Sequence, residues 1–275
     1  MPKESELYPS DSPTALFGFE LRRLRKARGW SQLQLAKHIP YSVGTISTIE
    51  TAQRAPTEEF ARFCDEALEA DGALLRLWPM VSHSAAPMWF RPWLDVEATA
   101  DALRIWQPLM VPGLFQTEDY ARAILSGEPG AGPEEVEKQV TARMERQNLL
   151  TRVTPPMFWA VLDEGILHRP IESPAVMSAQ LEHLIELAQA PRITIQVLPF
   201  SARSTPGLLG GFVIAQTQGM ADTAYVESAG LLGRVTERPE DVSALTFRYE
   251  GIRAEAASQR ESLELIKEAA QKWMS

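Results

Sequence analysis

Three side chains near the middle of the chain have types and spacing suited to acid–base or metal chemistry. Asp163 and Glu164 are adjacent, and His168 follows Glu164 by four residues. On a helix, Glu164 and His168 would lie one turn apart and could share a proton or a metal ion. Two ligands do not make a site, however. The simpler interpretation is an acidic end of a strand followed by a surface histidine.

The rest of the chain adds no catalytic or metal-binding pattern. The four histidines are scattered and the single cysteine, Cys64, gives no zinc motif. Gly207, Gly210 and Gly211 lack the spacing of a phosphate-binding loop and the Lys-Ser/Thr pair that follows one. We therefore expect a protein that is not an enzyme and that needs no metal and no cofactor. An enzymatic alternative would require an activity that is lost when Glu164 or His168 is replaced.

Charge is distributed unevenly along the 275 residues, whose net charge is −9. Residues 20–55 contain seven Lys or Arg and two Asp or Glu, a net charge of +5, whereas residues 56–275 carry −12. A chain of this length suggests about two domains. A small basic block joined to a large acidic one is expected when one domain meets phosphates and the other meets something else.

Five short helices are predicted in and after the basic block, over residues 16–28, 31–39, 42–50, 57–68 and around 74–78. Ser31 and Gln34 form a capping-box pattern, and Ser42 and Thr57 can cap the third and fourth helices. Pro40 ends the second helix. The apolar positions expected to be buried include Leu33, Leu35, Ala36, Ile39, Ile46 and Ile49. Because a tight turn joins the second and third helices, the block is predicted to be a helix-turn-helix domain.

Residues 22–56, RRLRKARGWSQLQLAKHIPYSVGTISTIETAQRAP, resemble the DNA-binding domain of Xre-type (phage-repressor-like) regulators. The matching features are the basic first helix, Gly29-Trp30-Ser31-Gln32, Leu35-Ala36, Ile46-Ser47, Ile49-Glu50, Arg54 and Pro56. The resemblance implies that the helix starting near Ser42 enters the major groove, while the preceding helix touches the DNA backbone.

The same resemblance assigns roles to individual residues. Those that would face the bases are Val43, Gly44, Ser47 and Thr48. Those that would contact or lie near phosphates are Arg22, Ser31, Gln32, Ser42, Thr45 and Arg54. Elementary chemistry agrees, because free N–H groups at a helix N-terminus attract phosphate and arginine can pair with it bidentately.

Two positions depart from the usual pattern of that family. Gly44 cannot read a base and Val43 can contact only a thymine methyl, so we expect specificity to rely on dimerisation or on DNA shape. Ala52 stands where relatives often have glycine, so the turn that aims Arg54 is expected to differ.

The remaining chain is predicted to be an α+β domain. A helix is expected over residues 94–108, and further helices begin at Thr117, Pro133, Pro174, Pro239 and Ser258. About four strands are predicted, in MFWAVLDEG, ITIQVLPF, GGFVIAQT and TAYVES, and LLGRVTE is a candidate for one more. The fold class is therefore mainly α with an α+β C-terminal domain, in which helices surround a small mixed sheet.

This half is similar to the C-terminal domain of a large actinobacterial group of Xre-type regulators, over most of residues 88–272. The similar segments are QPLMVPGLFQTEDYARAIL, LDEGIL, QVLPF, AYVES and the closing helices. That domain is described mainly as one of unknown function, and the group is sometimes called antitoxin-like because its members pair with small proteins from neighbouring genes. The resemblance implies sensing or partner binding.

Four aromatic residues gather where the second domain begins: Trp89, Phe90, Trp93 and Trp106. The simpler interpretation is that they belong to the core. The alternative is that they line an apolar pocket for a ligand.

The domain boundaries follow from composition. We expect a flexible N-terminus over 1–14, the helix-turn-helix domain over 15–80, a hinge over 81–90 and the α+β domain over 91–275. The start of the chain has no apolar signal region, and no apolar run approaches the ~18 residues of a membrane helix. With one cysteine, the chain favours a reducing compartment, so a cytoplasmic location is expected.

Together these observations predict a cytoplasmic, sequence-specific transcriptional regulator that binds a double-stranded DNA operator as a homodimer. The second domain would set the dimer and receive the signal. The alternative is an antitoxin-like interaction module that binds a small protein encoded by a neighbouring gene. Co-purification of such a protein would favour the alternative, and tight operator binding by the isolated chain would weaken it.

Overall fold

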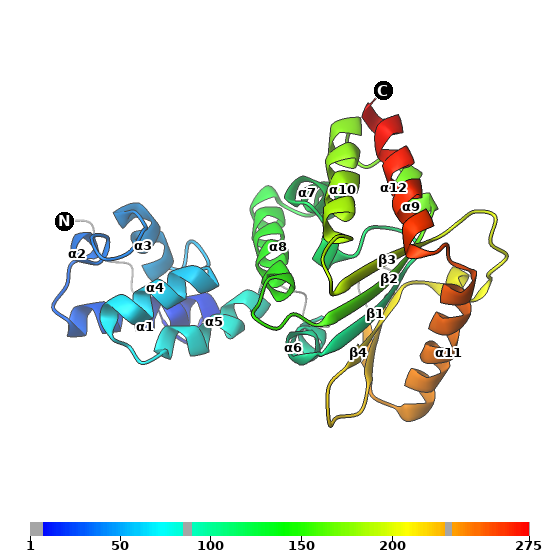
Figure 1. The fold of residues 1–275 in the computed structure, drawn as a ribbon. Coiled ribbons are helices and arrows are strands. Elements are labelled where there is room, and N and C mark those ends of the chain that lie inside the picture. The colour runs from blue at the N-terminus through cyan, green and yellow to red at the C-terminus, as the bar shows by residue number, and fades with distance from the viewer. Residues whose placement is uncertain (1–7, 85–89, 229–232, 275) are drawn as a thin grey trace. The chain divides into compact units, whose positions relative to one another are not determined.

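The computed structural model describes residues 8–84, 90–228 and 233–274. The chain divides into two compact units, Met1–Met88 and Trp89–Ser275 (Figure 1). The first helix begins at Pro13, inside the segment expected to be a flexible N-terminus, and the fifth extends to Ser84, into the expected hinge. The other hinge residues, 85–89, lie outside the described residues.

The first unit contains five helices, as predicted, but the second ends at Leu35 and not at residue 39, so Pro40 does not end it. They are α1 (Pro13–Ala27), α2 (Gln32–Leu35), α3 (Val43–Glu50), α4 (Glu58–Leu68) and α5 (Ala73–Ser84). Four of them begin with a side-chain oxygen that accepts a hydrogen bond from the backbone N–H three residues on, supplied by Ser12, Ser31, Ser42 and Thr57. Each cap satisfies one of the N–H groups that a helix N-terminus leaves unpaired. The caps predicted from sequence are therefore confirmed.

The core of the first unit gathers apolar residues from all five helices, including Phe17, Leu35, Ile46, Phe60 and Leu74. The prediction that Leu33 is buried is wrong, because 59% of its surface is exposed. The helix α2 is barely one turn long. Residues two apart on a helix point to nearly opposite sides, so burying Leu35 turns Leu33 toward solvent.

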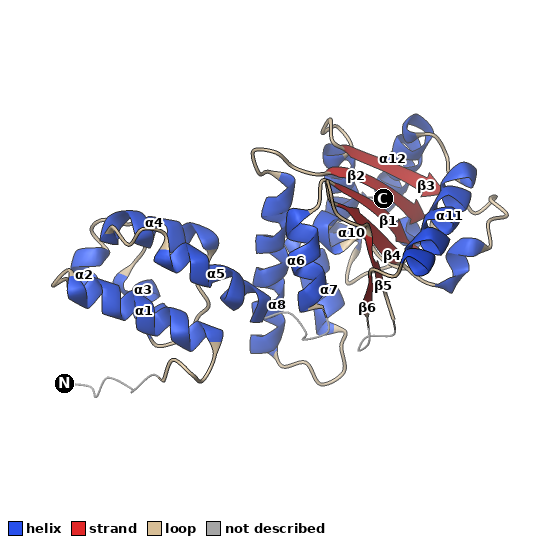
Figure 2. Cartoon of the chain, turned by 90° about the horizontal axis from the view of Figure 1, so that it is seen from below, coloured by secondary structure: helices blue, strands red, loops and turns tan. Residues whose placement is uncertain are grey.

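The second unit is built on a six-stranded mixed sheet, in the order β3-β2-β1-β4-β5-β6 (Figures 1 and 2). The strands are β1 (Ala102–Gln107), β2 (Met157–Asp163), β3 (Ile193–Leu198), β4 (Phe212–Gln216), β5 (Thr223–Val226) and β6 (Arg234–Thr236). The first three run parallel, and β4, β5 and β6 add antiparallel neighbours. The mixed sheet and the α+β class are confirmed, although the sheet is larger than the four or so strands expected.

The strand β1 corrects the prediction of one helix over residues 94–108. Only the first part is helical, as α6 (Arg91–Thr99), and the chain then enters the sheet between β2 and β4. A central strand is buried on both faces, so its apolar residues form a near-continuous run that periodicity alone does not separate from a helix. Leu103 and Ile105 face one core cluster, whereas Trp106 faces another.

Helices cover both faces of the sheet (Figure 2). One face packs against α6, α7 (Glu118–Ser126), α10 (Pro174–Leu187) and α12 (Gln259–Met274), and α8 (Pro133–Arg146) packs on α7. The other face packs against α11 (Pro239–Glu255). Four short helical turns complete the unit: η1 (Gly113–Phe115), η2 (Gln147–Leu150), α9 (Gly165–His168) and η3 (Pro206–Leu209). Within the described ranges, no helix is long and apolar enough to span a bilayer.

Candidate nucleic-acid interface

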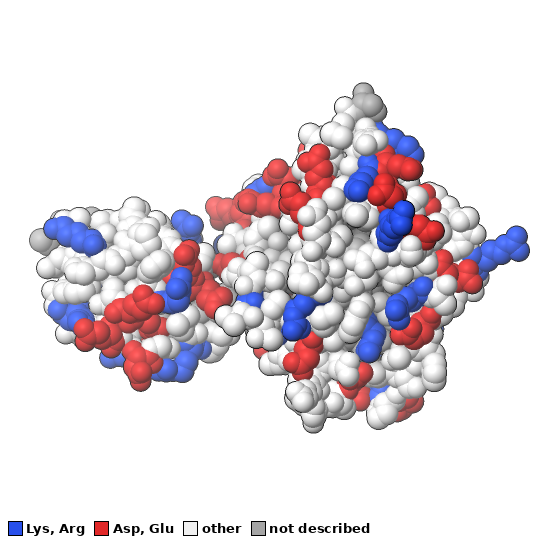
Figure 3. All heavy atoms as spheres, viewed as in Figure 1, with Lys and Arg blue, Asp and Glu red and all other residues white. Residues whose placement is uncertain are grey.

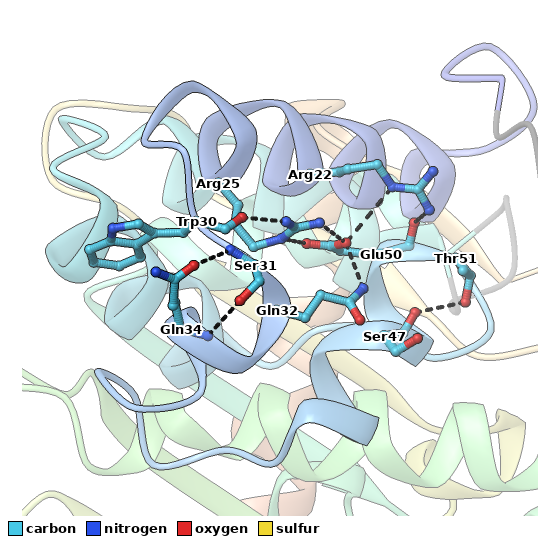
Figure 4. Close-up of polar contacts among 9 residues, drawn as sticks. All are labelled: Arg22, Arg25, Trp30, Ser31, Gln32, Gln34, Ser47, Glu50 and Thr51. Carbon is cyan, nitrogen blue, oxygen red and sulfur yellow. Dashed lines mark hydrogen bonds and ion pairs between the residues drawn. The ribbon is translucent and has the colours of Figure 1, made fainter. Parts of the chain in front are cut away.

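A buried carboxylate holds the first three helices of the N-terminal unit together. Glu50, the last residue of α3, is fully buried. Its two oxygens accept from the Arg25 guanidinium at 2.5 and 2.7 Å, and Oε2 also accepts from Gln32 Nε2 at 2.8 Å. Arg22 Nη2 donates to the backbone carbonyl of Glu50 at 3.0 Å. Side chains from α1 and α2 thus converge on the end of α3 and fix its orientation (Figure 4).

The Arg25–Glu50 pair was not recognised in the sequence, where Arg25 counted only toward the basic charge of the first helix. The spacing of residues in the first helix could have indicated that Arg25 is buried. Arg25 continues the i, i+4 row of Phe17 and Leu21, both fully buried, so its stem follows the apolar stripe of α1. A buried cation requires a charged or polar partner. In the structure the carboxylate of Glu50 is that partner.

A close approach of α1 and α3 also depends on Gly18. A Cβ at this position would lie 2.6 Å from the backbone oxygen of Ile49. Only glycine therefore allows the two helices to cross at this separation.

The helix α3 presents one face to the core and one outward. Ile46, Ile49 and Glu50 are buried, whereas Ser42 and Gly44 are exposed. The remaining predicted base-facing residues, Val43, Ser47 and Thr48, are partly exposed. The structure therefore places all four predicted base-facing residues on the outward side of one short helix.

The hydroxyl of Thr48 is engaged within that helix. Its Oγ1 lies 3.1 Å from the carbonyl oxygen of Gly44 and 3.0 Å from that of Thr45, and it donates its proton locally. Thr48 can then offer only a methyl group and an oxygen acceptor outward.

The residues predicted to lie near phosphates separate into two groups. Ser31 and Ser42 are exposed N-caps, and Ser42 Oγ also lies 3.0 Å from Thr45 Oγ1. Arg54 is exposed, and its side chain makes no hydrogen bond or ion pair with the described residues. These four residues are available to an external anion.

The other two, Gln32 and Arg22, have internal partners. The amide of Gln32 donates to Glu50, and Arg22 donates to the Glu50 carbonyl. Their placement favours a structural role, in which they orient α3. A phosphate contact by either residue stays a prediction.

The turn after α3 keeps a backbone conformation that glycine favours. Ala52 has a φ of +56°, in the left-handed region. A side chain there costs roughly 1–2 kcal/mol. The chain therefore tolerates strain at the position that precedes Arg54 by two residues.

Two family comparisons agree with this division of the chain. A helix-turn-helix domain family matches residues 16–78. A second family, described as a domain of unknown function (DUF5753), matches residues 90–268, more than half of the chain. The chain belongs to the DUF5753 family. No curated protein and no solved structure matches it significantly. The helix-turn-helix domain of this DUF5753 protein indicates a DNA-binding regulator.

Surface charge does not mark the interface by itself. Acidic and basic side chains are interspersed on the faces of both units seen in Figure 3. Basic side chains in and just after α1 are paired with carboxylates, as in Arg23–Glu20 and Arg28–Glu69. The candidate interface of this DUF5753 protein therefore rests on helix N-termini, short polar side chains and Arg54.

The structure does not bring together all four aromatic residues predicted to line a pocket. Trp93 is buried in the core on one face of the sheet, with Phe90 packed against it, whereas Trp106 is buried on the other face. Trp89 lies outside the described residues. Trp93 and Trp106 thus belong to separate cores and do not line one cavity.

The acid–base candidates do lie close together, with local structural partners. Glu164 Oε1 lies 3.6 Å from His168 Nε2, and Glu164 Oε2 accepts from the backbone N–H of Phe200 at 2.6 Å. Asp163 Oδ1 accepts from the N–H of Gly165. Among the described residues, no group of three His, Cys, Asp or Glu could hold a metal ion. These contacts fix the turn after β2.

Proposed function

We propose that this DUF5753 protein is a sequence-specific, Xre-type transcriptional regulator that binds an operator as a homodimer. In this proposal it acts in the cytoplasm, has no enzymatic activity and receives its signal through the DUF5753 domain. The helix α3 lies in the major groove, and Val43, Gly44, Ser47 and Thr48 face the bases.

One observation carries the proposal. Within the described part of the first unit, the outward side of α3 is exposed or partly exposed from Ser42 to Thr48, while its opposite side is held by the buried Arg25–Glu50–Gln32 network. A rigidly held helix with an exposed N-terminal end fits a groove, and its neighbouring N-caps point N–H groups at phosphates. The net charge of +5 over residues 20–55 adds a favourable long-range field.

Dimerisation follows from the small size of this interface. One short helix whose second residue is Gly44 supplies few base contacts, and two-fold dimers present paired recognition helices to two half-sites. The DUF5753 domain is the larger unit and is the natural place for the dimer contact.

The direct test uses the full chain and the DNA upstream of its own gene. We expect nuclease protection of a short two-fold-symmetric site, and binding that weakens steeply with salt. A scrambled duplex of equal length and composition should bind far more weakly. Equal binding to both duplexes would contradict sequence-specific regulation.

A second candidate is an antitoxin-like module that binds a small neighbour-encoded protein. Exposed apolar side chains favour it, because Leu208 and Leu209 of η3 and Phe247 of α11 are each more than 70% exposed, and η3 packs against α11. Phe247 also lines a surface hollow of about 320 Å³. Contiguous exposed apolar surface often marks a protein interface, and these side chains would contribute to one.

Co-expression with the neighbouring genes tests this candidate. A small protein that co-purifies with the full chain, and is lost with Phe247→Ser and Leu208→Ser, would favour it. Arg192→Gln, a surface change outside η3 and α11, serves as the control. Tight operator binding by the isolated chain, with no co-purifying protein, would argue against it.

A further inference from the structure

The helix α3 carries no side chain that can read a purine by two hydrogen bonds. Bidentate reading of guanine requires arginine or lysine, and that of adenine requires asparagine or glutamine. None of these residue types occurs in α3, whose sequence is VGTISTIE. The amides of α2 are engaged within the first unit (Figure 4). Gln32 donates to Glu50, and Gln34 Oε1 accepts from the N–H of Ser31. Base reading by α3 therefore depends on shorter side chains.

Most hydroxyl groups on the outward side of α3 are engaged by the helix itself. Thr48 Oγ1 donates locally, at 3.1 Å from the carbonyl oxygen of Gly44 and 3.0 Å from that of Thr45. Ser42 Oγ accepts from the N–H of Thr45 and lies 3.0 Å from Thr45 Oγ1. Ser47 Oγ has no hydrogen-bond partner among the described residues. A hydroxyl can turn to donate or to accept, so Ser47 distinguishes the bases poorly.

The same side of α3 does offer methyl groups. Val43 carries two and Thr48 carries one, and both side chains are partly exposed. Branching at Cβ restricts their rotamers, and the local hydrogen bonds of Thr48 hold its side chain further. In the major groove, the apolar group that complements a methyl group is the C5-methyl of thymine. Contact between such groups removes apolar surface from water, which favours binding.

Gly44 has no explanation within the first unit. Its φ is not positive, so its backbone does not require glycine. Among the described residues, a Cβ at this position would meet Ser42 Oγ alone within 4 Å, at an ordinary contact distance of 3.6 Å. Glycine in a helix is also less favourable than alanine. Because side chains on a helix lean over the preceding turn, the absent side chain leaves open space beside Thr48. The bare backbone favours close approach by a group from outside.

We propose that α3 recognises the C5-methyl group of a pyrimidine in the major groove. The methyl group occupies the space that Gly44 leaves open and packs against the methyl groups of Val43 and Thr48. Thymine carries this group, and 5-methylcytosine carries it beside a different polar edge. The inference rests on the proposed function, since it names the feature of the bases that α3 would read.

Base analogues test the inference on the full chain and on the upstream site that it protects from nuclease. Deoxyuridine in place of thymine, one position at a time, removes only the methyl group. At the contacted position the affinity should fall about fourfold, as expected for one buried methyl-sized group. No loss at any position would overturn the proposal. A gain from 5-methylcytosine over cytosine at that position would show that the methyl group suffices with either polar edge, and a deoxyuridine effect alone would assign the contact to thymine.

Protein variants then locate the partner of the methyl group. In the double variant that carries Val43→Ala and Thr48→Ser, deoxyuridine should cost less than about twofold, because most of the apolar partner surface is gone. Thr48→Ser keeps the hydroxyl. The matched control is Thr246→Ser on α11, where Oγ1 donates to the Val242 carbonyl at 2.9 Å. It should keep the full deoxyuridine penalty. A full penalty in the folded double variant would overturn the proposal.

Gly44→Ala gives a second test that does not depend on that double variant. The added methyl fits the folded chain but fills the space assigned to the pyrimidine methyl. The variant should therefore fold, and it should weaken binding to the thymine duplex more than to the deoxyuridine duplex. Gly251→Ala on α11, whose Cβ also meets no atom within 4 Å, is the control and should change neither affinity. Equal weakening of both duplexes by Gly44→Ala, or no weakening, would overturn the proposal.

Binding of unmodified duplexes separates this inference from the proposed function. Sequence-specific binding that is insensitive to deoxyuridine overturns only the methyl contact and leaves the regulator in place. Failure to bind any duplex overturns both.

Discussion

At the scale of single residues, burial separates the ion pairs that position the helices of the candidate interface from those that lie at the surface. Glu50 and Arg25 are buried and mutually paired, whereas Glu20 and Arg23 form a pair at the surface. Breaking a buried pair leaves an uncompensated charge in a medium that solvates it poorly, but an exposed pair is replaced by water.

Glu50→Gln should therefore lower the free energy of unfolding by about 3–5 kcal/mol. The matched control Glu20→Gln should cost less than about 1 kcal/mol. Urea titration of both variants measures the difference. Equal, small losses in the two variants would show that Glu50 does not hold the three helices together.

Arg54→Ala should weaken binding to all duplexes alike and reduce the slope of log affinity against log salt by about one. The reason is that Arg54 is exposed, without a described partner, and just beyond α3. Arg192→Gln is the control for a lost surface charge. An unchanged slope would remove Arg54 from the phosphate contacts.

Glu227, which directly follows β5, makes the stability of the second unit depend on pH. Because its pKa is raised on folding, the folded chain binds more protons than the unfolded chain between the two pKa values. The free energy of unfolding should then rise as the pH falls from the folded pKa toward the unfolded value near 4.3. Glu227→Gln should raise Tm at pH 7.5, and this gain should vanish near pH 4. A gain that is independent of pH would contradict the role of burial.

At the scale of elements, capping chemistry is local and was readable from the sequence. The caps at Ser31, Ser42 and Thr57 need only residues within one turn, and all three form. The strand β1 was not readable, because its identity depends on β2 and β4, which follow it by about 50 and 105 residues in the chain. The exposure of Leu33 was also missed, since it depends on where a one-turn helix is docked.

The candidate site was only partly predictable for the same reason. The outward positions of α3 follow from helical spacing and a family resemblance. The internal engagement of Gln32 and Arg22 with Glu50 depends on how three helices meet, which one sequence does not display.

Gly18→Ala tests the packing of α1 against α3. The added methyl would lie 2.6 Å from the Ile49 oxygen, so the helices must separate. We expect a loss of about 1–3 kcal/mol in the free energy of unfolding together with weaker DNA binding. Gly251→Ala on α11 meets no atom within 4 Å and should instead stabilise by up to about 1 kcal/mol. Equal gains in both would mean that α1 and α3 do not need this close approach.

At the scale of the whole molecule, the chain combines a compact helical unit with a larger α+β unit. In our account the first unit reads DNA, and the second joins two copies and receives the signal. We expect the acidic balance of residues 56–275 to limit non-specific adhesion to DNA, because like charges repel.

The central claim is that α3 reads base edges. The most direct measurement is selection of bound sequences from a pool of random duplexes, made in parallel for the full chain and for Val43→Thr. The account predicts one enriched two-fold-symmetric motif with half-site centres about 10 base pairs apart. It also predicts that Val43→Thr changes the preferred base within each half-site. No enriched motif, or an identical motif for both proteins, would contradict it.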